Sequence, residues 1–371
     1  MDTHKKLQLL SDASQYDLAC ACGTNSQDRR KRGSDGAWLY PVSIPSGGSA
    51  IMLKTLMSNV CVNDCAYCPY RETTDTPRCT IGPDDMASLF LDYERKMNLI
   101  GLFLSSGVIK NPDMSMQLLN DTARILRKKH NYKGYIHLKI IPGASDAAID
   151  DALSLATTVS LNIETPGELR FKKLSSKKNY LNDIIKPMQR ISLMTSKGAQ
   201  FEKVGKTTQF IVGASDETDA EIVKYTAGLY KKLSFDRVYF SAYQKGLGDR
   251  GIPGENAFGN PEHTFTREHR LYQVDFLLRQ YSFTENDICF TGNGSLSMDT
   301  DPKMMWAQRH PEYYPVCINR ASKTELMKVP GIGPLTATRI VKMRKVSRID
   351  SLDKLPLSGK RKLCAIEYIA L

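Results

Sequence analysis

Short apolar runs alternate with amphipathic stretches from about residue 50 to residue 282. In most of the stretches between the runs, apolar residues recur at three- and four-residue steps, which is typical of helices. Six strand–helix units in series predict a parallel sheet with right-handed crossovers. Because a complete barrel of this kind has eight units, we expect an α/β fold that forms a partial (βα)6 barrel, open on one side. The six predicted strands span residues 50–59, 99–106, 135–141, 158–164, 207–212 and 237–243.

The segments on either side of this barrel have different patterns. Residues 1–49 are rich in polar and small residues, with a basic cluster at 28–33, and predict an irregular N-terminal extension. Residues 283–317 contain Gly and Pro and predict a connector. Two helix-like stretches around the sequence PGIGP predict a small all-α module over residues 318–371.

The composition is that of an ordinary globular protein, with 41% hydrophobic and 25% charged residues in a chain of 371. No run of 18 or more apolar residues occurs, so we expect no membrane span. The N-terminus lacks the apolar core of a signal peptide, which favours a cytoplasmic location, where thiols stay reduced. Nine cysteines, an odd number with three of them clustered, then indicate metal ligation rather than a disulfide framework.

The basic charge is concentrated at the C-terminal end. Residues 318–371 contain 12 Lys and Arg against 4 Asp and Glu, whereas residues 1–317 contain 39 against 36. Of the net charge of +11, +8 therefore falls on the last 54 residues. A strongly basic unit beside a nearly neutral one is typical of a protein that binds a polyanion. A solvated, lysine-rich tail is the alternative.

The clustered cysteines, Cys61, Cys65 and Cys68, lie in CVNDCAYC, directly after the first predicted strand. A structural zinc site uses four protein ligands, and a catalytic zinc usually takes His or carboxylate partners; neither set is present nearby. A [4Fe–4S] cluster also needs four ligands, so three cysteines leave one iron open to a small molecule. S-adenosylmethionine can chelate that iron, and an electron from the cluster then cleaves it to a 5′-deoxyadenosyl radical. The three cysteines are our candidate metal ligands and catalytic residues, with structural zinc as the alternative.

The C-x3-C-x2-C spacing, with Tyr67 directly before the third cysteine, resembles the signature of radical S-adenosylmethionine enzymes. The motif follows strand one of a six-unit βα barrel, and this place in the fold also resembles that of the motif in the family. The resemblance implies two cofactors, a [4Fe–4S] cluster and S-adenosylmethionine. It also implies a reducing electron donor such as flavodoxin or ferredoxin.

The resemblance further implies cofactor contacts at the carboxyl ends of later strands. The family's glycine-containing motif after strand two corresponds here to Ser-Ser-Gly, although the acidic residue that usually ends the motif is absent. The end of strand four is similar to a ribose-binding pair, and the end of strand five to the apolar–Gly segment that packs on adenine. The implied cofactor-binding residues are Tyr67, Ser105, Ser106, Gly107, Asn162, Glu164, Val212 and Gly213. Ordinary turn chemistry is the alternative for the Ser-Ser-Gly segment and for Gly213.

The C-terminal sequence SKTELMKVPGIGPLTATRIVKMRK resembles a helix-hairpin-helix module, a DNA-binding element without sequence specificity. Ser322 and Glu325 form a predicted capping box for the first helix. Glycines in the hairpin let the backbone approach a phosphate, and amides at the start of the second helix donate to its oxygens. An αα-hairpin that only caps the barrel is the alternative. The candidate nucleic-acid-binding residues are Gly331, Ile332, Gly333, Lys328, Arg339, Lys342, Arg344 and Lys345, of which Ile332 is expected to shape the hairpin.

Nearly the whole chain resembles bacterial radical S-adenosylmethionine proteins described as DNA modification or repair proteins, often encoded beside a uracil-DNA glycosylase-like protein. The resemblance includes DASQYDLACA near the start, the cysteine motif, DPKMMWAQRHPEYYPVCINRAS and the PGIG hairpin. It implies DNA as the substrate or partner, and the glycosylase-like protein as a candidate partner. The tail SLDKLPLSGKRKLCAIEYIAL is a candidate second copy of the hairpin.

Several further residues are candidates on position alone. Cys20 and Cys22 could ligate a second cluster or act as resolving thiols, with ordinary small residues near an active site as the alternative. His137 lies in the predicted strand 135–141, where side chains point alternately to the two faces. It either faces the barrel lumen or is a buried core histidine. The end of the sixth strand, Tyr243 to Lys245, faces the expected substrate mouth.

Three functional hypotheses follow from the sequence. The first is a radical S-adenosylmethionine enzyme that abstracts hydrogen from a nucleotide of DNA, which requires a flipped base or a single strand. The second keeps the radical chemistry but takes RNA, a protein or a small molecule as the substrate, with the hairpin used only for docking. The third is a non-enzymatic nucleic-acid-binding protein whose three cysteines hold a structural metal.

Overall fold

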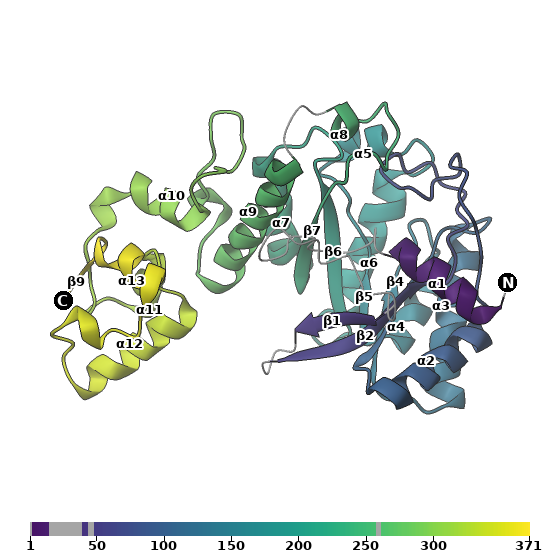
Figure 1. The fold of residues 1–371 in the computed structure, drawn as a ribbon, viewed down its shortest axis with the longest axis horizontal. Coiled ribbons are helices and arrows are strands. Elements are labelled where there is room, and N and C mark those ends of the chain that lie inside the picture. Colours follow the sequence, from purple (N-terminus) through teal and green to yellow (C-terminus); the bar gives the residue numbers. More distant parts are fainter. Residues whose placement is uncertain (1, 15–38, 44–47, 257–260) are drawn as a thin grey trace. The chain divides into compact units, whose positions relative to one another are not determined.

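The computed structural model describes residues 2–14, 39–43, 48–256 and 261–371. The chain divides into two compact units (Figure 1). The first comprises Met1–Glu217 and Gly228–Glu268, and the second comprises Thr218–Ala227 and His269–Leu371. The second unit therefore begins well before residue 318, where the sequence pattern placed the start of the C-terminal module.

A seven-stranded sheet forms the centre of the first unit, with its strands in sequence order from β1 to β7. The antiparallel strand β1 pairs with β2, and every later pair is parallel. Each parallel strand thus lies beside the next one in the chain, as in a barrel with right-handed crossovers. Within the described residues β7 pairs only with β6, so the barrel stays open. The strands are β1 (Leu39–Ser43), β2 (Ser49–Leu56), β3 (Gly101–Ser105), β4 (Tyr135–Lys139), β5 (Thr158–Ser160), β6 (Gly205–Val212) and β7 (Arg237–Ala242).

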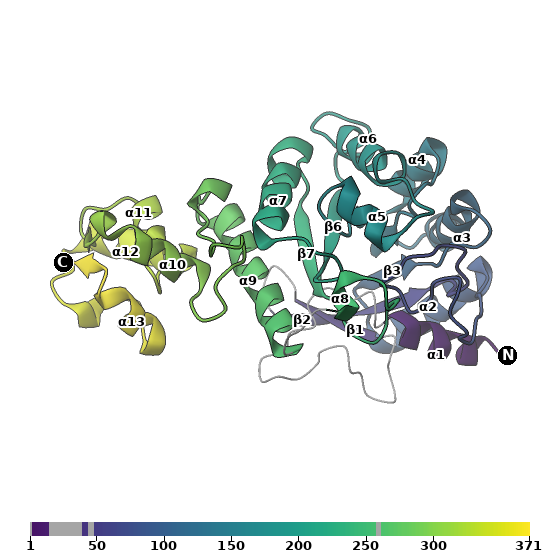
Figure 2. The same cartoon turned by 90° about the horizontal axis from the view of Figure 1, so that it is seen from above.

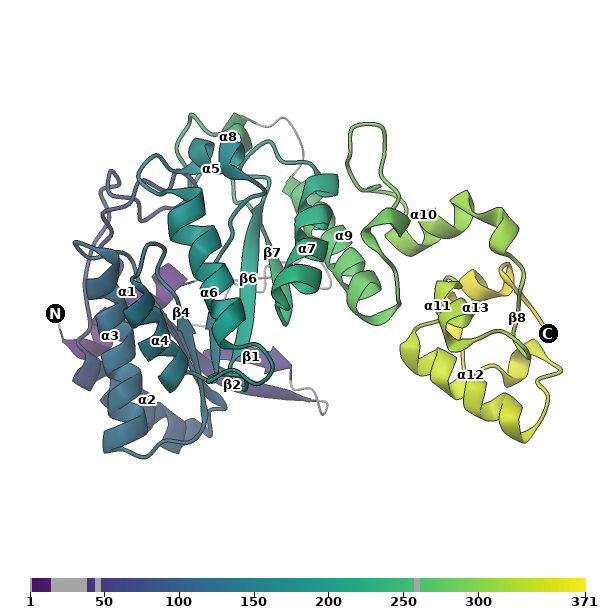
Figure 3. The ribbon, with the colours of Figure 1, turned by 180° about the vertical axis from the view of Figure 1, so that it is seen from behind.

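Helices follow the parallel strands and cover the outer face of the sheet. Figure 2 shows α2, α3, α4 and α6 in an arc around the strands, and Figure 3 shows the same helices side by side from behind. Side chains cap two of them, since Asn111 accepts from the Met114 amide and Ser145 from the Ala148 amide. The helices of the first unit are α2 (Pro83–Met97), α3 (Pro112–Arg124), α4 (Asp146–Leu155), α5 (Glu168–Leu174), α6 (Lys186–Met194) and α8 (Pro253–Asn256), with π-helical turns at Ile125–Lys129 and Tyr180–Ile185. Two more helices, α7 (Asp219–Leu233) and α9 (Pro261–Gln280), have residues in both units.

The N-terminal extension is not wholly irregular, which corrects the sequence-based expectation for residues 1–49. It contains the helix α1 (Thr3–Ser14) and the strand β1. Leu7, Leu10 and Ala13 of α1 are buried, and α1 contacts β2. Their three-residue spacing is a helical pattern. Its polar and charged neighbours hid it in the sequence.

The C-terminal part of the second unit has its own apolar core. Ile318, Leu326, Val329, Ile332 and Ile340 are almost completely buried in it. The elements around this core are α10 (Pro302–Arg309), β8 (Val316–Cys317), α11 (Lys323–Lys328), α12 (Pro334–Val346), α13 (Gly359–Ile366) and β9 (Ile369–Ala370). Ser322 and Glu325 form the predicted capping box of α11.

The predicted connector, residues 283–317, is part of this packing rather than a spacer. It contains α10, whose Trp306 is 5% exposed and contacts Phe283 and Tyr314 edge to face. These aromatic contacts explain why the second unit starts upstream of residue 318. The predicted fold class, a partial (βα)6 barrel with a small helical module at the C-terminus, is confirmed. Across the described ranges, none of the helices has the length and apolar character needed to span a bilayer.

Candidate functional sites

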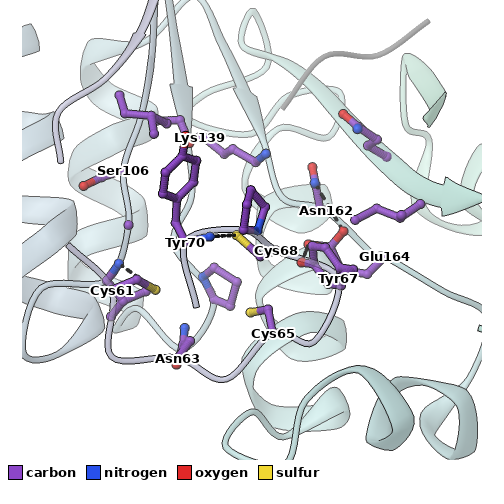
Figure 4. Close-up of a pocket in the computed structure, with 18 of the residues that line it drawn as sticks. Cys61, Asn63, Cys65, Tyr67, Cys68, Tyr70, Ser106, Lys139, Asn162 and Glu164 are labelled. Atoms are coloured by element: carbon purple, nitrogen blue, oxygen red, sulfur yellow. Dashed lines mark hydrogen bonds between the residues drawn. The ribbon is translucent and has the colours of Figure 1, made fainter. Parts of the chain in front are cut away.

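A cavity of about 190 Å³ opens at the carboxyl ends of the parallel strands (Figure 4). Cys61, Cys65 and Cys68 all line it, so the fold brings together the three cysteines that the sequence analysis singled out. The ends of the strands add further polar groups to the wall. These include Ser105, Lys139, Asn162, Gln209 and Ser241.

The cysteines lie on a long loop that side-chain hydrogen bonds hold in place. An isolated antiparallel β-bridge between Ser58 and Thr80 joins the two ends of the loop. Inside it, the Arg78 guanidinium donates to the carbonyl oxygens of Asn59 (2.5 Å) and Tyr70 (2.8 Å) and to two more carbonyls. Arg78 thus satisfies backbone acceptors that no regular secondary structure serves.

Asp64, between the first two cysteines, fastens this loop to the segment after α5. Its carboxylate accepts from the Ser175 hydroxyl (2.5 Å), from the Ser176 amide (2.8 Å) and hydroxyl (2.6 Å), and from the Lys177 amide (3.2 Å). Burial opposes ionisation, but these donors lower the pKa of Asp64 to about 2. The sequence analysis did not single out Asp64, because a single Asp in a loop carries no distinctive signal.

Burial suppresses ionisation of two of the thiols. It raises the pKa of Cys65, and it raises the pKa of Cys68 to about 12, with the neighbouring Cys65 adding to the effect. A thiol of this kind becomes a thiolate when a metal coordinates it. Backbone amides approach two of the sulfurs, from Val108 to Cys61 (3.5 Å) and from Tyr70 to Cys68 (3.4 Å).

No three His, Cys, Asp or Glu side chains in the described part of the chain are arranged to hold a metal ion. An iron–sulfur cluster binds each of its cysteines at a separate iron atom. Figure 4 shows the three cysteines at separate points along the loop that borders the cavity.

Tyr67 and Glu164 form the most direct contact between the cysteine loop and the strand ends. The Tyr67 hydroxyl donates to Glu164 Oε1 at 2.7 Å, and the Asn162 amide lies 3.4 Å from Glu164 Oε2. Burial and the Glu164 charge raise the pKa of Tyr67 well above its usual value, so it stays a donor. Glu164 has a φ of 64°, in the left-handed region, and its side chain is buried, with 5% exposed. Such a conformation in a buried non-glycine residue is typical of functional sites.

The Ser-Ser-Gly segment at the end of β3 also lines the cavity. The buried hydroxyl of Ser106 has no hydrogen-bond partner among the described residues. Gly107 lies so close to the cysteine loop that a Cβ atom would overlap the carbonyl oxygen of Val60. The segment therefore has a packing role and a hydroxyl that is available to a polar ligand.

The predicted adenine contact at the end of β6 needs correction. Gln209 and Ile211 line the cavity, but Val212 and Gly213 do not. Because side chains alternate along a strand, Val212 points to the opposite face and is completely buried there. The Gly213 amide donates to Glu217, outside the cavity.

The loop after β7 contributes to the cavity through Tyr243, Gln244 and Leu247, whereas the exposed Lys245 does not line it. The Tyr243 hydroxyl donates to Glu255, which also accepts from the Gly246 amide at 2.8 Å. Of the other candidates, His137 is a buried histidine, with Nε2 2.9 Å from the Ser160 hydroxyl. Cys20 and Cys22 lie outside the described residues.

In the second unit, the glycines of the hairpin have different roles. Gly331 has φ of 80°, and a Cβ atom there would overlap the carbonyl oxygen of Arg361 at the start of α13. Gly333 is the N-cap residue of α12, and no side chain caps that helix. Ile332 is 1% exposed, so its side chain shapes the hairpin from inside, as expected.

The basic residues predicted to bind nucleic acid are of two kinds: some side chains are exposed, and others interact with groups of the protein itself. Arg339, Lys342 and Lys345 on α12 are exposed. Lys328 is only 8% exposed, which corrects its assignment as a phosphate contact: its ammonium group lies 3.1 Å from Asp287 and over the rings of Phe283 and Trp306. The partly buried Arg344 donates to the Ile318 carbonyl at 2.8 Å.

A sequence-family profile described as a helix-hairpin-helix motif matches residues 313–366. The match includes α11, α12 and α13, so it spans the PGIG hairpin and residues 351–366 of the candidate second copy. No curated protein matches this chain.

Among solved structures, the chain is similar to the FeFe-hydrogenase maturase HydG from Carboxydothermus hydrogenoformans, with 16% identity over 59% of this chain and 51% of that chain and a TM-score of 0.45. It is also similar to methylornithine synthase (PylB), with 13% identity, 61% of each chain covered and a TM-score of 0.47. A third similar structure is that of the radical S-adenosylmethionine methyltransferase TsrM from Kitasatospora setae. Its sequence identity is 13%, the match covers 52% of this chain and 36% of that chain, and the TM-score is 0.40. The chain thus spans about half to three fifths of the length of the first two. At this level of similarity we transfer no function from them.

Proposed function

We propose that this protein is a radical S-adenosylmethionine enzyme that acts on DNA. Cys61, Cys65 and Cys68 would hold a [4Fe–4S] cluster and leave its fourth iron to S-adenosylmethionine. The observation that carries the proposal is that all three thiols of a C-x3-C-x2-C motif line one cavity at the carboxyl ends of parallel strands. In βα barrels the chemistry is located at this end of the strands.

The residues of the cavity fit these two groups. Three cysteine sulfurs are the donor set that iron–sulfur clusters use. Ser106 contributes a buried hydroxyl without a partner among the described residues, and such a group is normally satisfied by a ligand or water. Asn162 and Glu164 add an amide and a carboxylate, which suit the hydroxyl groups of a ribose.

When bound and reduced, the cluster would supply the electron that cleaves the sulfonium of S-adenosylmethionine to a 5′-deoxyadenosyl radical. The chain's own residues would position the reactants and exclude water. Tyr67 holds Glu164 in place through its hydroxyl, and Arg78 and Asp64 keep the cysteine loop in one conformation. Lys139, Gln209 and Ser241 would contact the substrate from the strand ends.

DNA is the substrate that the C-terminal unit favours. The uncapped start of α12 leaves backbone amides available to a phosphate, and Arg339, Lys342 and Lys345 are exposed beyond it. A low-potential donor such as flavodoxin or ferredoxin would reduce the cluster. A uracil-DNA glycosylase-like protein is a candidate partner, and we propose a cytoplasmic location for the enzyme.

The test is anaerobic reconstitution with iron and sulfide, followed by electron paramagnetic resonance of the reduced protein with and without S-adenosylmethionine. We expect about four irons per chain, a spectrum that changes when S-adenosylmethionine is added, and release of 5′-deoxyadenosine. Cys65→Ala should abolish all three results. Cys79→Ala, a cysteine outside the cavity, should abolish none of them. Zinc in place of iron would instead support a non-enzymatic binding protein.

The choice of DNA is tested separately by competition between DNA and RNA of the same sequence over a salt series. Binding of DNA with a steep salt dependence supports the proposal. Preference for RNA, or no salt dependence, would leave radical chemistry on another substrate.

A further inference from the structure

Lys178 lines the cavity, although no sequence pattern singled it out. It lines the wall and lies beside the sulfur of Cys65, with the Glu164 carboxylate nearby. Among the side chains that form the described wall, Lys178 and Lys139 are the basic ones. A lysine placed beside a buried thiol has a desolvation cost, which needs a compensating interaction.

The local structure explains how Lys178 comes to face the sulfur. The residues directly before Lys178 are held by the Asp64 carboxylate. It accepts hydrogen bonds from Ser175, Ser176 and the Lys177 amide. The Lys177 ammonium group is directed away from the cavity, to the Val62 carbonyl oxygen (2.8 Å) and to Glu72. The next side chain, Lys178, then faces the cavity. The same carboxylate that fastens the cysteine loop therefore also positions this ammonium group.

The groups around Lys178 are the Glu164 carboxylate and the thiols of Cys65 and Cys61. If the thiols become thiolates around a cluster, this region gains several negative charges, and reduction adds one more. Net charge and hydrogen bonds to the sulfurs are two of the factors that set the reduction potential of an iron–sulfur cluster.

We propose that Lys178 raises the reduction potential of the cluster held by Cys61, Cys65 and Cys68, and so makes it easier to reduce. This inference rests on the proposed function. The reaction concerned is transfer of one electron from a low-potential donor to the oxidised cluster, with no proton transferred and no bond broken at Lys178. The ammonium group stabilises the reduced cluster more than the oxidised one, because the reduced cluster carries one more negative charge.

The experiment is an anaerobic redox titration of the reconstituted full-length protein, followed by the electron paramagnetic resonance signal of the reduced cluster. Lys178→Met removes the charge and the donor, Lys178→Gln removes only the charge, and Lys178→Arg keeps both. The matched control is Lys172→Met, because Lys172 is an exposed lysine on the preceding helix that pairs with Glu168. Iron and sulfide are counted in every variant, so that the potentials compared are those of intact clusters.

We expect Lys178→Met and Lys178→Gln to shift the reduction equilibrium at least tenfold toward the oxidised cluster, about 59 mV for a one-electron couple. Lys178→Arg and Lys172→Met should titrate like the unmodified protein. Equal potentials in all variants with intact clusters would overturn the role of Lys178 but leave the proposed function standing. If the reduction potential shifts in Lys178→Met but not in Lys178→Gln, the effect comes from hydrogen bonding, and the charge mechanism is overturned. If the unmodified protein holds no cluster, the proposed function fails and this inference fails with it.

Discussion

The cysteine loop of the first unit and the hairpin of the second are both irregular segments, but they are held in opposite ways. Charged side chains hold the cysteine loop, with Asp64 accepting from the segment after α5 and Arg78 donating to carbonyl oxygens inside the loop. Backbone and apolar contacts hold the hairpin, where Gly331 fits against the Arg361 carbonyl and Ile332 is buried. The first arrangement positions side chains toward a cavity, and the second leaves the start of α12 without a side-chain cap.

This difference predicts how each region responds to substitution. In a network of charged hydrogen bonds, removing one residue breaks several hydrogen bonds at once, so single changes have large effects. In the hairpin, the exposed charges act independently, and only the glycines and the buried core should be sensitive. Lys303 is an exception in the second unit, because its partly buried side chain donates to a carbonyl oxygen of the hairpin.

The largest effect should come from Lys303, whose ammonium group donates to the Ile332 carbonyl at 2.6 Å and lies 4.8 Å from the Tyr281 ring. Burial lowers its pKa from 10.5 to about 7, with Asp301 opposing the shift and Lys328 adding to it. Between these values the unfolded chain holds a proton that the folded protein has released. The free energy of unfolding should therefore rise with pH across this window, by on the order of 4 kcal/mol.

Urea unfolding across the range from about pH 7 to about pH 10 checks this prediction. In a Trp38→Phe background, Trp306 is the single tryptophan and reports on the second unit. Lys303→Met should remove the rise with pH, whereas the exposed Lys360→Met should keep it. The same slope in Lys303→Met and in the parent would refute the assignment.

The next largest effect should come from Asp64→Ala in the cysteine loop. The substitution removes the acceptor of four donors from Ser175, Ser176 and Lys177. Hydrogen bonds to charged groups each contribute about 1.5–3 kcal/mol, and water will replace part of this at a partly exposed site. We expect unit 1 to lose about 2–3 kcal/mol, measured by urea unfolding, and to retain less iron after reconstitution. Asp75→Ala, an exposed aspartate of the same loop, is the control, and equal losses in the two variants would contradict the prediction.

A somewhat smaller effect is expected from Gly331→Ala in the hairpin. Alanine would be strained at φ of 80°, and its Cβ atom would overlap the Arg361 carbonyl. Strain and overpacking each cost about 1–3 kcal/mol, so the second unit should lose roughly 2 kcal/mol after relaxation. The unfolding of Trp306 in the Trp38→Phe background measures this loss. Gly292→Ala, which meets no atom within 4 Å, should unfold like the parent; a stable Gly331→Ala variant would show that the hairpin is not held by backbone packing.

The fold was predictable from the sequence because its signals are local. Each of the six parallel strands coincides with a predicted apolar run, and the capping box at Ser322 and Glu325 was read from two residues. The N-terminal helix was missed because only Leu7, Leu10 and Ala13 mark its buried face.

The candidate sites were predictable only in part, because their partners are distant in the sequence. The cysteine spacing is local, but the partners of Asp64 lie more than a hundred residues away, and Lys178 reaches Cys65 only through the fold. Lys328 was misassigned for the same reason. A lysine in a basic helix looks exposed until Asp287, 41 residues upstream, is placed beside it.

The smallest effect should come from the exposed charges of α12. If Lys342 contacts one phosphate, Lys342→Ala should lower the slope of log affinity against log salt concentration by about 0.9 and weaken DNA binding only a few-fold. Because Arg339 and Lys342 are exposed side chains whose contacts with DNA would be independent, the double variant should lower the slope by about 1.8. Fluorescence anisotropy with a labelled duplex over a salt series measures both, with Lys197→Ala as an exposed control in the first unit. A loss in the double variant that far exceeds the sum would mean that the hairpin, like the cysteine loop, acts as a coupled network.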